Sequence, residues 1–562
     1  MSREFRGDSL VEMLRYRAEV QPLDRAYTFL HNGDEESFTV SWSELDRQSR
    51  AIAAHLQTRV APGERALLLY PSGLEFIAAF FGCLYARVVA VPVQMPHGGR
   101  ADAAQERLRA IADDATPAAV LTTAAARHRL QAVAPLAIEW VATDQMHERV
   151  EHDWRAPDVS DGTLAFLQYT SGSTARPRGV MVSHGNLINN LTSAFHLGET
   201  PMGGASVSWL PMTHDMGLIE GVLQPAFSGC PAYLMSPGAF LQRPVRWLRA
   251  ISRYRAVRSG APNFAFDLVV ERVPVEQRED LVLESWSAAY SGAEPIRDDT
   301  LRRFSEAFSA CGFDGSAFRP SYGLAESTLL VTTGRWQAAA ASDGVVSCGH
   351  PAADTEVAIA DVATGRRCVD GEIGEIRVSG PSVALGYWQR PEETEHTFGG
   401  HLDGSDARWL RTGDLGMCRN GELFVTGRIK DLLIVRGLKH FPQDIERNVE
   451  RSHRDLRPGA VVAVAVSTSA RGDHVAVIAE LHARAERDNV DQIIASIRRV
   501  VADGHGIQLH GVALVAPGTV PKTPSGKLRR FLCRDAWRAG TLDTCAVWSE
   551  TGSHLPRSER VH

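Results

Sequence analysis

Cysteine is scarce in this sequence and follows no structural pattern. The 562 residues include eight cysteines, spread from Cys83 to Cys545. None forms a CxxC pair, and no Cys/His cluster has the spacing of a zinc site. A disulfide-based scaffold is therefore excluded, and we expect a reducing, cytoplasmic environment.

Long apolar runs are also missing. The longest, residues 76–86, is far shorter than the ~20 residues that a membrane-spanning helix requires. Residues 1–6 carry charge, but no apolar segment of the kind found in signal peptides follows them. We therefore expect neither a membrane span nor a secretion signal.

Neither sign of charge dominates. The 60 Lys and Arg side chains against 67 Asp and Glu give a formal net charge of −7, and no basic stripe predicts nucleic-acid binding.

A composition of 44% hydrophobic and 23% charged residues excludes a disordered chain. The 48 glycines follow no collagen-like period. The length corresponds to a few domains of about 100–200 residues each.

Apolar strand patterns and helix patterns alternate through most of the chain. Residues 65–70 predict a strand, 73–85 a helix and 88–93 a second strand. This rhythm predicts an α/β fold in which parallel sheets are covered by helices.

The pattern changes from about Gly371, where short β-like runs alternate with Gly and Asp turns. After Lys430 the α/β pattern returns. We therefore predict a large N-terminal domain over residues 1–429, whose β-rich subdomain covers about 346–429, and a smaller α/β C-terminal domain over residues 430–562.

The clearest motif is residues 169–180, Tyr-Thr-Ser-Gly-Ser-Thr-Ala-Arg-Pro-Arg-Gly-Val, which follow an apolar strand. Small residues let backbone N–H groups approach an anion, hydroxyls add donors, and arginines bind phosphate through paired N–H groups. This chemistry predicts a phosphate cradle, although the spacing of a Walker loop is absent. A flexible Ser/Thr/Gly surface loop is the alternative.

Three further motifs are weak signals individually. Residues 521–530 form a stiffened turn that presents Lys527, for which a solvated basic turn is the alternative. Residues 411–416, with Gly-Arg-Ile-Lys-Asp at 427–431, offer partners for ribose hydroxyls or form ordinary Asx turns. Residues 321–328 offer an aromatic face for a base and a carboxylate for Mg²⁺.

Together and in this order, the motifs resemble those of the adenylate-forming superfamily: acyl-CoA synthetases, peptide-synthetase adenylation domains and luciferases. The resemblance covers about residues 38–530. Other segments more narrowly resemble fatty acyl-AMP ligases: residues 209–219 (WLPMTHDMGLI), 260–267 (GAPNFAFD), 291–297 (SGAEPIR), 346–349 (VSCG), 386–388 (GYW) and 439–446 (KHFPQDIE). Members of that group activate fatty acids as acyl adenylates. These ligases usually pass the activated acyl group to the phosphopantetheine thiol of an acyl carrier protein.

The resemblance implies ATP, retained as AMP in the adenylate, and Mg²⁺ as cofactors. It implies that Lys527 bridges the carboxylate and the α-phosphate, that His214 lies near the carboxylate, and that Glu326 binds Mg²⁺, with Thr170 as a second candidate ligand. Lys430 would be the hinge of a mobile C-terminal domain. The implied nucleotide-binding residues are Thr170, Ser171, Gly172, Ser173, Thr174 and Arg178 at the phosphates, Gly292, Ala293, Glu294, Ser321, Tyr322 and Gly323 around the adenine, and Asp414 and Arg428 at the ribose.

Four apolar residues beside these motifs are candidates for the acyl pocket, with a place in the plain core as the alternative: Trp209, Met216, Phe264 and Phe266. The implied partners are a fatty acid and a separate acyl carrier protein.

Three departures from the usual pattern keep alternatives open. Ala175 replaces a usual glycine, Arg178 replaces a usual lysine, and the segment between Thr333 and Val346 is shorter than in most fatty acyl-AMP ligases. The alternatives are a fatty acyl-CoA synthetase, a catalytically degenerate adenylate-binding regulatory protein, and an enzyme for a small or aryl acid.

Overall fold

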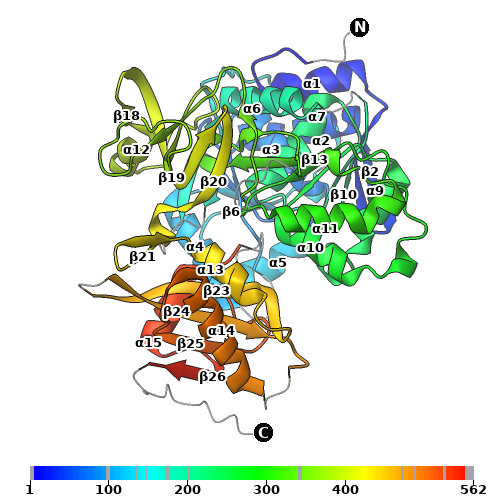
Figure 1. The fold of residues 1–562 in the computed structure, drawn as a ribbon. Helices are drawn as coiled ribbons and strands as arrows, with labels where there is room; N and C mark the ends of the chain where they lie inside the picture. The colour runs from blue at the N-terminus through cyan, green and yellow to red at the C-terminus, as the bar shows by residue number, and fades with distance from the viewer. Residues whose placement is uncertain are drawn as a thin grey trace. The chain divides into compact units, whose positions relative to one another are not determined.

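The computed structural model describes residues 5–96, 101–133, 136–146, 148–170, 177–199, 203–338, 345–469, 472–485, 489–522 and 527–550. Contacts divide the chain into two compact units (Figure 1). The first comprises Met1–Thr412 and Gly416–Val425, and the second comprises Gly413–Leu415 and Thr426–His562. The predicted boundary near Lys430 lies a few residues beyond this division.

One sheet of the first unit contains the strand–helix–strand segment predicted at residues 65–93. In spatial order its strands are β6 (Glu139–Ala142), β5 (Ala119–Thr122), β3 (Arg65–Leu68), β4 (Val89–Pro92), β7 (Leu164–Thr170) and β8 (Arg178–Ser183). Neighbours are parallel except β7 and β8, which pair antiparallel. The expectation of parallel strands is wrong at this edge, because the few residues between β7 and β8 are too short for a crossover.

A second sheet of the first unit has a parallel interior and antiparallel ends. Its strands are, in order, β15 (His350–Pro351), β14 (Leu330–Thr333), β13 (Phe318–Gly323), β12 (Ala288–Ser291), β11 (Arg258–Ala261), β9 (Ser206–Ser208), β10 (Ala232–Leu234), β1 (Arg25–His31) and β2 (Glu35–Ser41). The antiparallel ends again follow from short turns, such as the one between His31 and Glu35.

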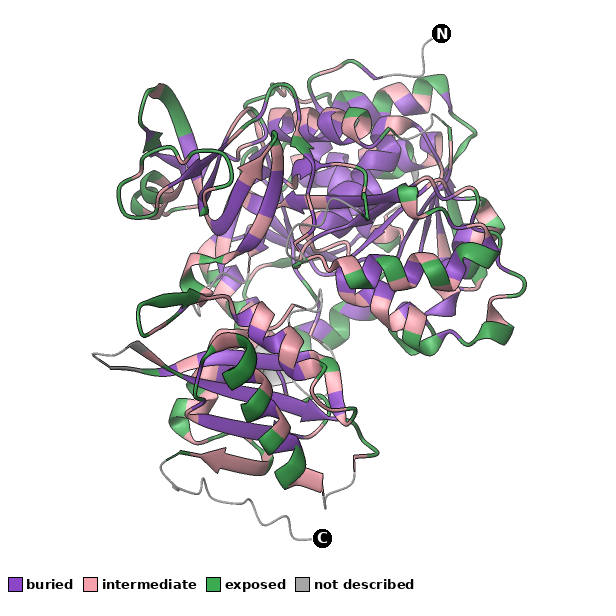
Figure 2. Ribbon diagram, viewed as in Figure 1, coloured by how far each residue is buried: buried purple, intermediate pink, exposed green. Residues whose placement is uncertain are grey.

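Helices cover these sheets and bury the apolar side chains between them (Figure 2). They are α1 (Leu10–Val20), α2 (Trp42–Gln57), α3 (Glu75–Tyr85), α4 (Ala101–Ala115), α5 (Ala124–Val133), α6 (His184–Leu197), the π-helical η4 (Met216–Leu223), α7 (Gln224–Ser228), α8 (Pro237–Gln242), α9 (Val245–Tyr254), α10 (Asn263–Arg272) and α11 (Asp298–Phe308). Helix α3 is buried almost throughout, because its sequence is apolar on every side. Its Phe80 packs edge to face on Phe166 of β7, with ring centroids 5.9 Å apart. This contact supports the strand that leads to the predicted phosphate cradle.

The predicted β-rich region contains a sheet with antiparallel neighbours and one helix. The strands are β16 (Glu356–Ala360), β17 (Gly374–Ser379), β19 (Ser405–Arg419) and β18 (Gly400–Leu402), with β20 (Glu422–Arg428) paired to β19, and the helix is α12 (Pro391–Phe398). Trp409 of β19 is fully buried there and packs with Ala358, Ala360 and Leu402.

The second unit is the predicted smaller α/β region. Its strands are β22 (Leu438–His440), β21 (Leu433–Val435), β24 (Gly472–Leu481), β25 (Gly511–Val515) and β26 (Thr544–Ser549), with β23 (Leu456–Ser469) paired to β24, and its helices are α13 (Pro442–Glu450), α14 (Val490–His505) and α15 (Arg530–Ala539). Alternate residues of β23 point to opposite faces. Val461 packs in the core that contains residues of α13 and α14, and Val462 packs in the core beneath α15.

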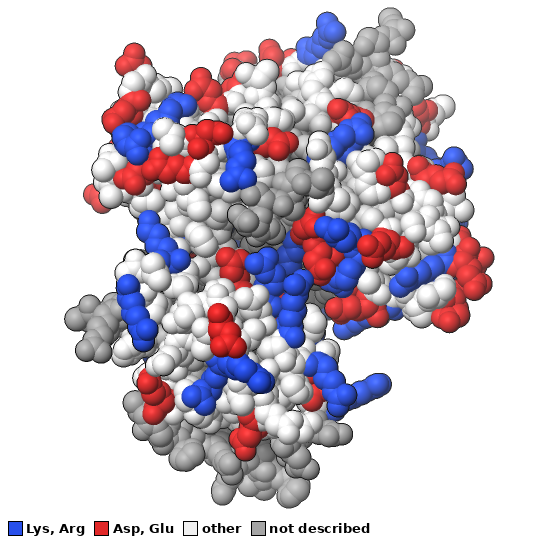
Figure 3. All heavy atoms as spheres, in the orientation of Figure 1, with Lys and Arg blue, Asp and Glu red and all other residues white. Residues whose placement is uncertain are grey.

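Charged side chains of both signs occur across the face drawn in Figure 3. This distribution agrees with the small net charge of −7. In the described part of the chain, no helix has the combined length and apolar character that crossing a bilayer requires.

Candidate active site

The predicted phosphate cradle joins two antiparallel strands. Thr170 ends β7, Arg178 begins β8, and the two residues are paired in register. Residues 171–176, which include the predicted Ser171, Gly172, Ser173 and Thr174, lie outside the described residues. The Thr170 hydroxyl is buried and has no hydrogen-bond partner among the described residues. Buried polar groups normally have a partner, so this hydroxyl fits a ligand oxygen.

Arg178 connects this hairpin to residues far along the chain. Its guanidinium carbon lies 4.8 Å from the centre of the Tyr387 ring, and its Nη1 pairs with Glu393 Oε2 at 3.3 Å. The Tyr387 hydroxyl in turn donates to Glu326 Oε1 at 2.8 Å. Burial, followed by the proximity of Glu326, raises the pKa of Tyr387, so the hydroxyl keeps the proton that it donates. A contact between Arg178 and phosphate stays a prediction.

Tyr387 is a site residue that sequence reasoning did not assign. It lies in the Gly-Tyr-Trp motif at 386–388, but nothing in that motif indicates a contact with Glu326, 61 positions earlier. The motif itself was the available signal, because it is one of the segments that resemble fatty acyl-AMP ligases. The contact itself required the tertiary structure.

Glu326 fits the predicted role of a magnesium ligand by its chemistry. It lies in the short helix η8 (Ala325–Ser327), and its carbonyl accepts from Ala384 N at 2.9 Å. Mg²⁺ is usually held by one or two carboxylates together with phosphate oxygens and water. Within the described ranges, no three His, Cys, Asp or Glu side chains gather as a metal site. A single carboxylate that acts together with nucleotide phosphates is therefore the arrangement these residues fit.

The residues predicted around the adenine lie at the carboxyl ends of β12 and β13: residues 292–294 follow β12, and residues 321–323 end β13. A Cβ on Gly292 would lie 3.0 Å from the carbonyl oxygen of Ser321, so the two segments approach closely there. Ala293 has a φ of +66°, a strained conformation for a residue with a side chain. Glu294 Oε1 accepts from Phe264 N at 2.6 Å, which ties the turn after β12 to α10. Contact between Glu294 and adenine stays a prediction.

Tyr322 and Gly323 lie where β13 pairs with β14. Tyr322 is buried, and Ser321 Oγ lies 2.9 Å from Thr333 Oγ1 across the pair. A Cβ on Gly323 would lie 1.7 Å from the carbonyl oxygen of Leu329, so only glycine fits at this position. The close strand pairing therefore holds the predicted adenine segment in one conformation.

His214 lies in a turn that is held from two sides. Its Nδ1 is 2.5 Å from Asp215 Oδ1, and the same carboxylate accepts from Met216 N at 2.7 Å at the start of η4. Gln168 of β7 donates from Nε2 to the Thr213 carbonyl at 3.1 Å. The turn is thus tied to the strand that leads into the predicted phosphate cradle.

The four pocket candidates have different surroundings. Trp209 stacks on Phe240, with ring centroids 4.0 Å apart, and meets Phe264 edge-on at 6.3 Å. Met216 is the first residue of η4 and is buried. Phe266 is fully buried among aromatic rings that include Trp247 at 5.5 Å. Phe266 therefore contributes to the core beside α10, and a pocket role for all four stays a prediction.

The remaining predicted residues belong to the second unit. Arg428 Nε donates to Asp414 Oδ1 at 2.9 Å, which brings together the two predicted ribose partners. Lys430 is exposed in the short helix η9 (Ile429–Asp431). Lys527 directly follows residues 523–526, which lie outside the described residues, and adjoins a bridge between Lys522 and Leu528.

Arg530, at the start of α15, anchors the segment that carries Lys527. Its Nη2 and Nε donate to Glu446 at 2.7 and 2.8 Å, and its Nη1 donates to Asp431 Oδ2 at 3.2 Å. Asp431 is the last residue of η9, so one guanidinium connects the segments of Lys430 and Lys527.

Comparison with known proteins places these motifs in one family. A family model described as AMP-binding enzyme matches residues 14–388. The chain belongs to the AMP-binding enzymes. A second model, described as Disco-interacting protein 2-like, AMP domain, matches residues 430–547.

This AMP-binding enzyme is similar to proteins of fatty-acid activation over nearly its whole length. It is 42% identical to a medium-chain-fatty-acid–[acyl-carrier-protein] ligase of Moorena producens, over 95% of this chain and 96% of the other. It is 38% identical to a putative fatty-acid–CoA ligase of Mycobacterium tuberculosis, over 94% and 98%. A solved fatty acyl-adenylate ligase of Legionella pneumophila, in complex with acyl adenylate and pyrophosphate, is 38% identical, covers 97% of this chain and 98% of that chain, and superposes with a TM-score of 0.73. The α/β adenylate-forming fold predicted for this AMP-binding enzyme is thereby confirmed.

Proposed function

We propose that this AMP-binding enzyme converts a fatty acid and ATP to acyl-AMP and pyrophosphate, and then transfers the acyl group to the phosphopantetheine thiol of a separate acyl carrier protein. One observation carries the proposal: the 42% identity to a protein named as a fatty-acid–[acyl-carrier-protein] ligase, over almost the whole of both chains. The adenylate and pyrophosphate named for the Legionella structure support the first step.

In this reaction a carboxylate oxygen attacks the α-phosphorus of ATP, and pyrophosphate leaves. Both reactants are anions, so catalysis depends on positioning and on positive charge at the phosphates. Lys527 would neutralise the carboxylate and α-phosphate, and the Thr170 hydroxyl would donate to a phosphate oxygen. His214, held by Asp215, would lie beside the carboxylate.

Glu326, oriented by Tyr387, would hold Mg²⁺ together with the phosphates. The ion would supply further positive charge to the phosphates. Asp414 and Arg428 would bind the ribose, and the segments around Gly292 and Tyr322 would enclose the adenine.

We further propose that Lys430 is the hinge about which residues 430–562 move between adenylation and thiol transfer. Its exposure and its place in a short helix between strands β20 and β21 support this role. A cytoplasmic location is supported by the cysteines, all of which are free thiols.

A second function is favoured by one relative. The Mycobacterium tuberculosis protein is named as a putative fatty-acid–CoA ligase. The short segment between Thr333 and Val346 also departs from the resemblance to fatty acyl-AMP ligases. Coenzyme A as the acceptor is therefore the alternative to a carrier protein.

One mass-spectrometric assay separates these functions. The purified enzyme is mixed with MgATP and saturated acids from hexanoic to octadecanoic acid, with no thiol, with coenzyme A, or with a phosphopantetheinylated carrier protein. We expect acyl-AMP to persist with coenzyme A and the acyl group to move to the carrier. Efficient formation of acyl-CoA would establish the alternative instead. Absence of any adenylate would contradict both and favour a regulatory adenylate-binding protein.

A further inference from the structure

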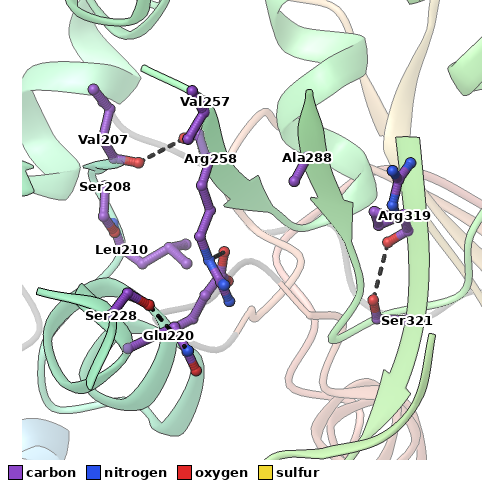
Figure 4. A network of polar contacts seen from close by, with 12 residues as sticks. Val207, Ser208, Leu210, Glu220, Ser228, Val257, Arg258, Ala288, Arg319 and Ser321 are labelled. Atoms are coloured by element: carbon purple, nitrogen blue, oxygen red, sulfur yellow. Dashed lines mark hydrogen bonds and ion pairs between the residues drawn. The ribbon is translucent and has the colours of Figure 1, made fainter. Parts of the chain in front are cut away.

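Four buried polar side chains lie between η4 and the second sheet, apart from the predicted catalytic residues. Figure 4 shows two of them, Glu220 and Arg258, pointing toward each other. The exposed fractions of all four are 8% or less. We call them the polar cluster: Glu220 of η4, Gln224 at the start of α7, Arg258 of β11 and Tyr290 of β12.

The members of the polar cluster do not fulfil one another's hydrogen-bonding capacity. Nε and Nη1 of Arg258, the hydroxyl of Tyr290 and Oε1 of Gln224 are buried without a hydrogen-bond partner in the described part of the chain. Arg258 Nε lies 3.9 Å from Glu220 Oε1, whereas a charge-assisted hydrogen bond spans about 2.7–2.9 Å. Each unsatisfied buried group is unfavourable, and charged ones most of all. An additional hydrogen-bonding group in the cluster would therefore be stabilising.

The backbone is adapted to place Glu220 here. A Cβ on Gly260 would lie 2.6 Å from both carboxylate oxygens of Glu220, so the glycine of β11 makes room for this side chain. Gly260 and Tyr290 are register partners on neighbouring parallel strands, and the Arg258 guanidinium carbon lies 4.6 Å from the centre of the Tyr290 ring. Glu220, Arg258 and Tyr290 thus meet on one face of the sheet.

The polar cluster lies about one turn of η4 away from Met216, a candidate for the acyl pocket. Glu220 is four residues after Met216 on η4, and this helix begins directly after the turn that holds His214. On the sheet, Tyr290 precedes the end of β12 at Ser291 and lies two positions before Gly292, a span of roughly 7 Å. An acyl chain that leaves a carboxylate near His214 and follows η4 would therefore reach Glu220.

A hydroxyl group matches the chemistry of the polar cluster better than a charged group. Its O–H can donate to the Glu220 carboxylate while its oxygen accepts from Arg258 or Tyr290. A second carboxylate would be repelled by Glu220, and an ammonium group by Arg258. Burial raises the pKa of Glu220 to about 7 although Arg258 opposes the shift, and the hydroxyl can bind either protonation state.

We propose that the polar cluster is a substrate subsite that binds a hydroxyl group on the acyl chain, away from the reacting carboxylate. The preferred substrates are then hydroxylated fatty acids. This inference rests on the proposed function and narrows its substrate class.

The test compares matched acids. ATP–pyrophosphate exchange is measured with octanoic, decanoic and dodecanoic acids, with the same acids carrying a hydroxyl at successive positions, and with the corresponding dicarboxylic acids. For the best hydroxylated acid we expect kcat/KM at least about tenfold above that of its unsubstituted parent, since buried polar groups discriminate against a substrate that leaves them unpaired. The dicarboxylic acids should be poorer than both. Equal use of hydroxylated and unsubstituted acids would overturn the inference and indicate that the cluster holds only water.

Two variants locate the effect. Glu220→Leu should reverse the preference between hydroxylated and unsubstituted acids, and Glu220→Gln should keep part of it because the amide still hydrogen-bonds. Glu375→Gln is the matched control, since Glu375 is another buried carboxylate, paired with Arg377 at 3.3 Å in the β-rich region. A Glu220→Leu variant that retains the wild-type preference would contradict the assignment.

A binding measurement distinguishes failure of the proposed function from failure of the subsite. Binding of the same acid pairs is measured by calorimetry without ATP. Discrimination in binding without any exchange would retain the subsite and refute the acyl-adenylate function. Exchange with equal binding and equal kcat/KM for all matched acids would retain the function and refute the subsite.

Discussion

The Tyr387 hydroxyl donates to Glu326 Oε1 at 2.8 Å while the face of the same ring lies 4.8 Å from the Arg178 guanidinium carbon. One side chain thus positions a predicted magnesium ligand and a predicted phosphate-binding residue. Neither partner is near Tyr387 in the sequence.

Removal of this hydroxyl should impair adenylation. In Tyr387→Phe, Glu326 loses a hydrogen bond to a charged group, and such bonds contribute about 1.5–3 kcal/mol. We expect kcat/KM for ATP–pyrophosphate exchange to fall by about ten- to a hundredfold, with a higher Mg²⁺ concentration needed for half-maximal rate. Tyr85→Phe is the control, because Tyr85 donates to Asp46 at 2.7 Å elsewhere in the first unit. Unchanged exchange and Mg²⁺ dependence in Tyr387→Phe would show that the contact is only structural.

Lys527→Ala should abolish adenylate formation and leave the fold intact. Loss of one charge-stabilising donor commonly costs about 10²–10³ in rate. Pyrophosphate release is the readout, and the melting temperature checks the fold. Lys522→Ala, in the same turn, should remain active. Wild-type pyrophosphate release by Lys527→Ala would refute the role of this lysine.

His184 should make stability depend on pH. The ring is 1% exposed, its Nδ1 accepts from Leu10 N at 3.2 Å, and burial lowers its pKa from 6.5 to about 4. Between these values the unfolded chain binds the proton and the folded chain does not. This contribution to stability is therefore complete above pH 6.5 and falls by about 3 kcal/mol as the pH drops to 4.

Denaturant unfolding at several pH values measures this effect. The free energy of unfolding of His184→Gln should decline less between neutral and acidic pH than that of the wild type. His128→Gln, which changes an exposed histidine, should follow the wild-type curve. Parallel curves for His184→Gln and the wild type would contradict the prediction.

Gly323→Ala should destabilise the first unit severely. The added Cβ would meet the Leu329 carbonyl oxygen at 1.7 Å, and backbone cannot move aside as a flexible side chain can. We expect a loss of about 3 kcal/mol or more in the free energy of unfolding, read from denaturant titration. Gly162→Ala introduces a Cβ that meets no atom within 4 Å and should cost little. Equal stabilities of the two variants would show that β13 and β14 can separate readily.

Local patterns predicted the interior of the fold well. The strands predicted at residues 65–70 and 88–93 are present as β3 (65–68) and β4 (89–92), with the predicted helix between them, because apolar periodicity reports which residues face the core. The same rhythm predicted parallel sheets, and the sheet edges differ from this at β2, β8, β14 and β15. Strand direction depends on the length of the connection, and short turns permit only antiparallel neighbours.

The sequence by itself determined the α/β alternation, the order of the motifs and the identity of candidate residues such as Thr170, Glu326 and Lys527. The alternation follows from apolar periodicity, and the motifs and candidate residues follow from the chemistry of short segments. Only the tertiary structure decided that Tyr387 orients Glu326 and that Glu220 meets Arg258 beside Gly260. Such contacts join segments far apart in the chain, and they form only when sheets and helices pack and exclude water from the polar groups between them.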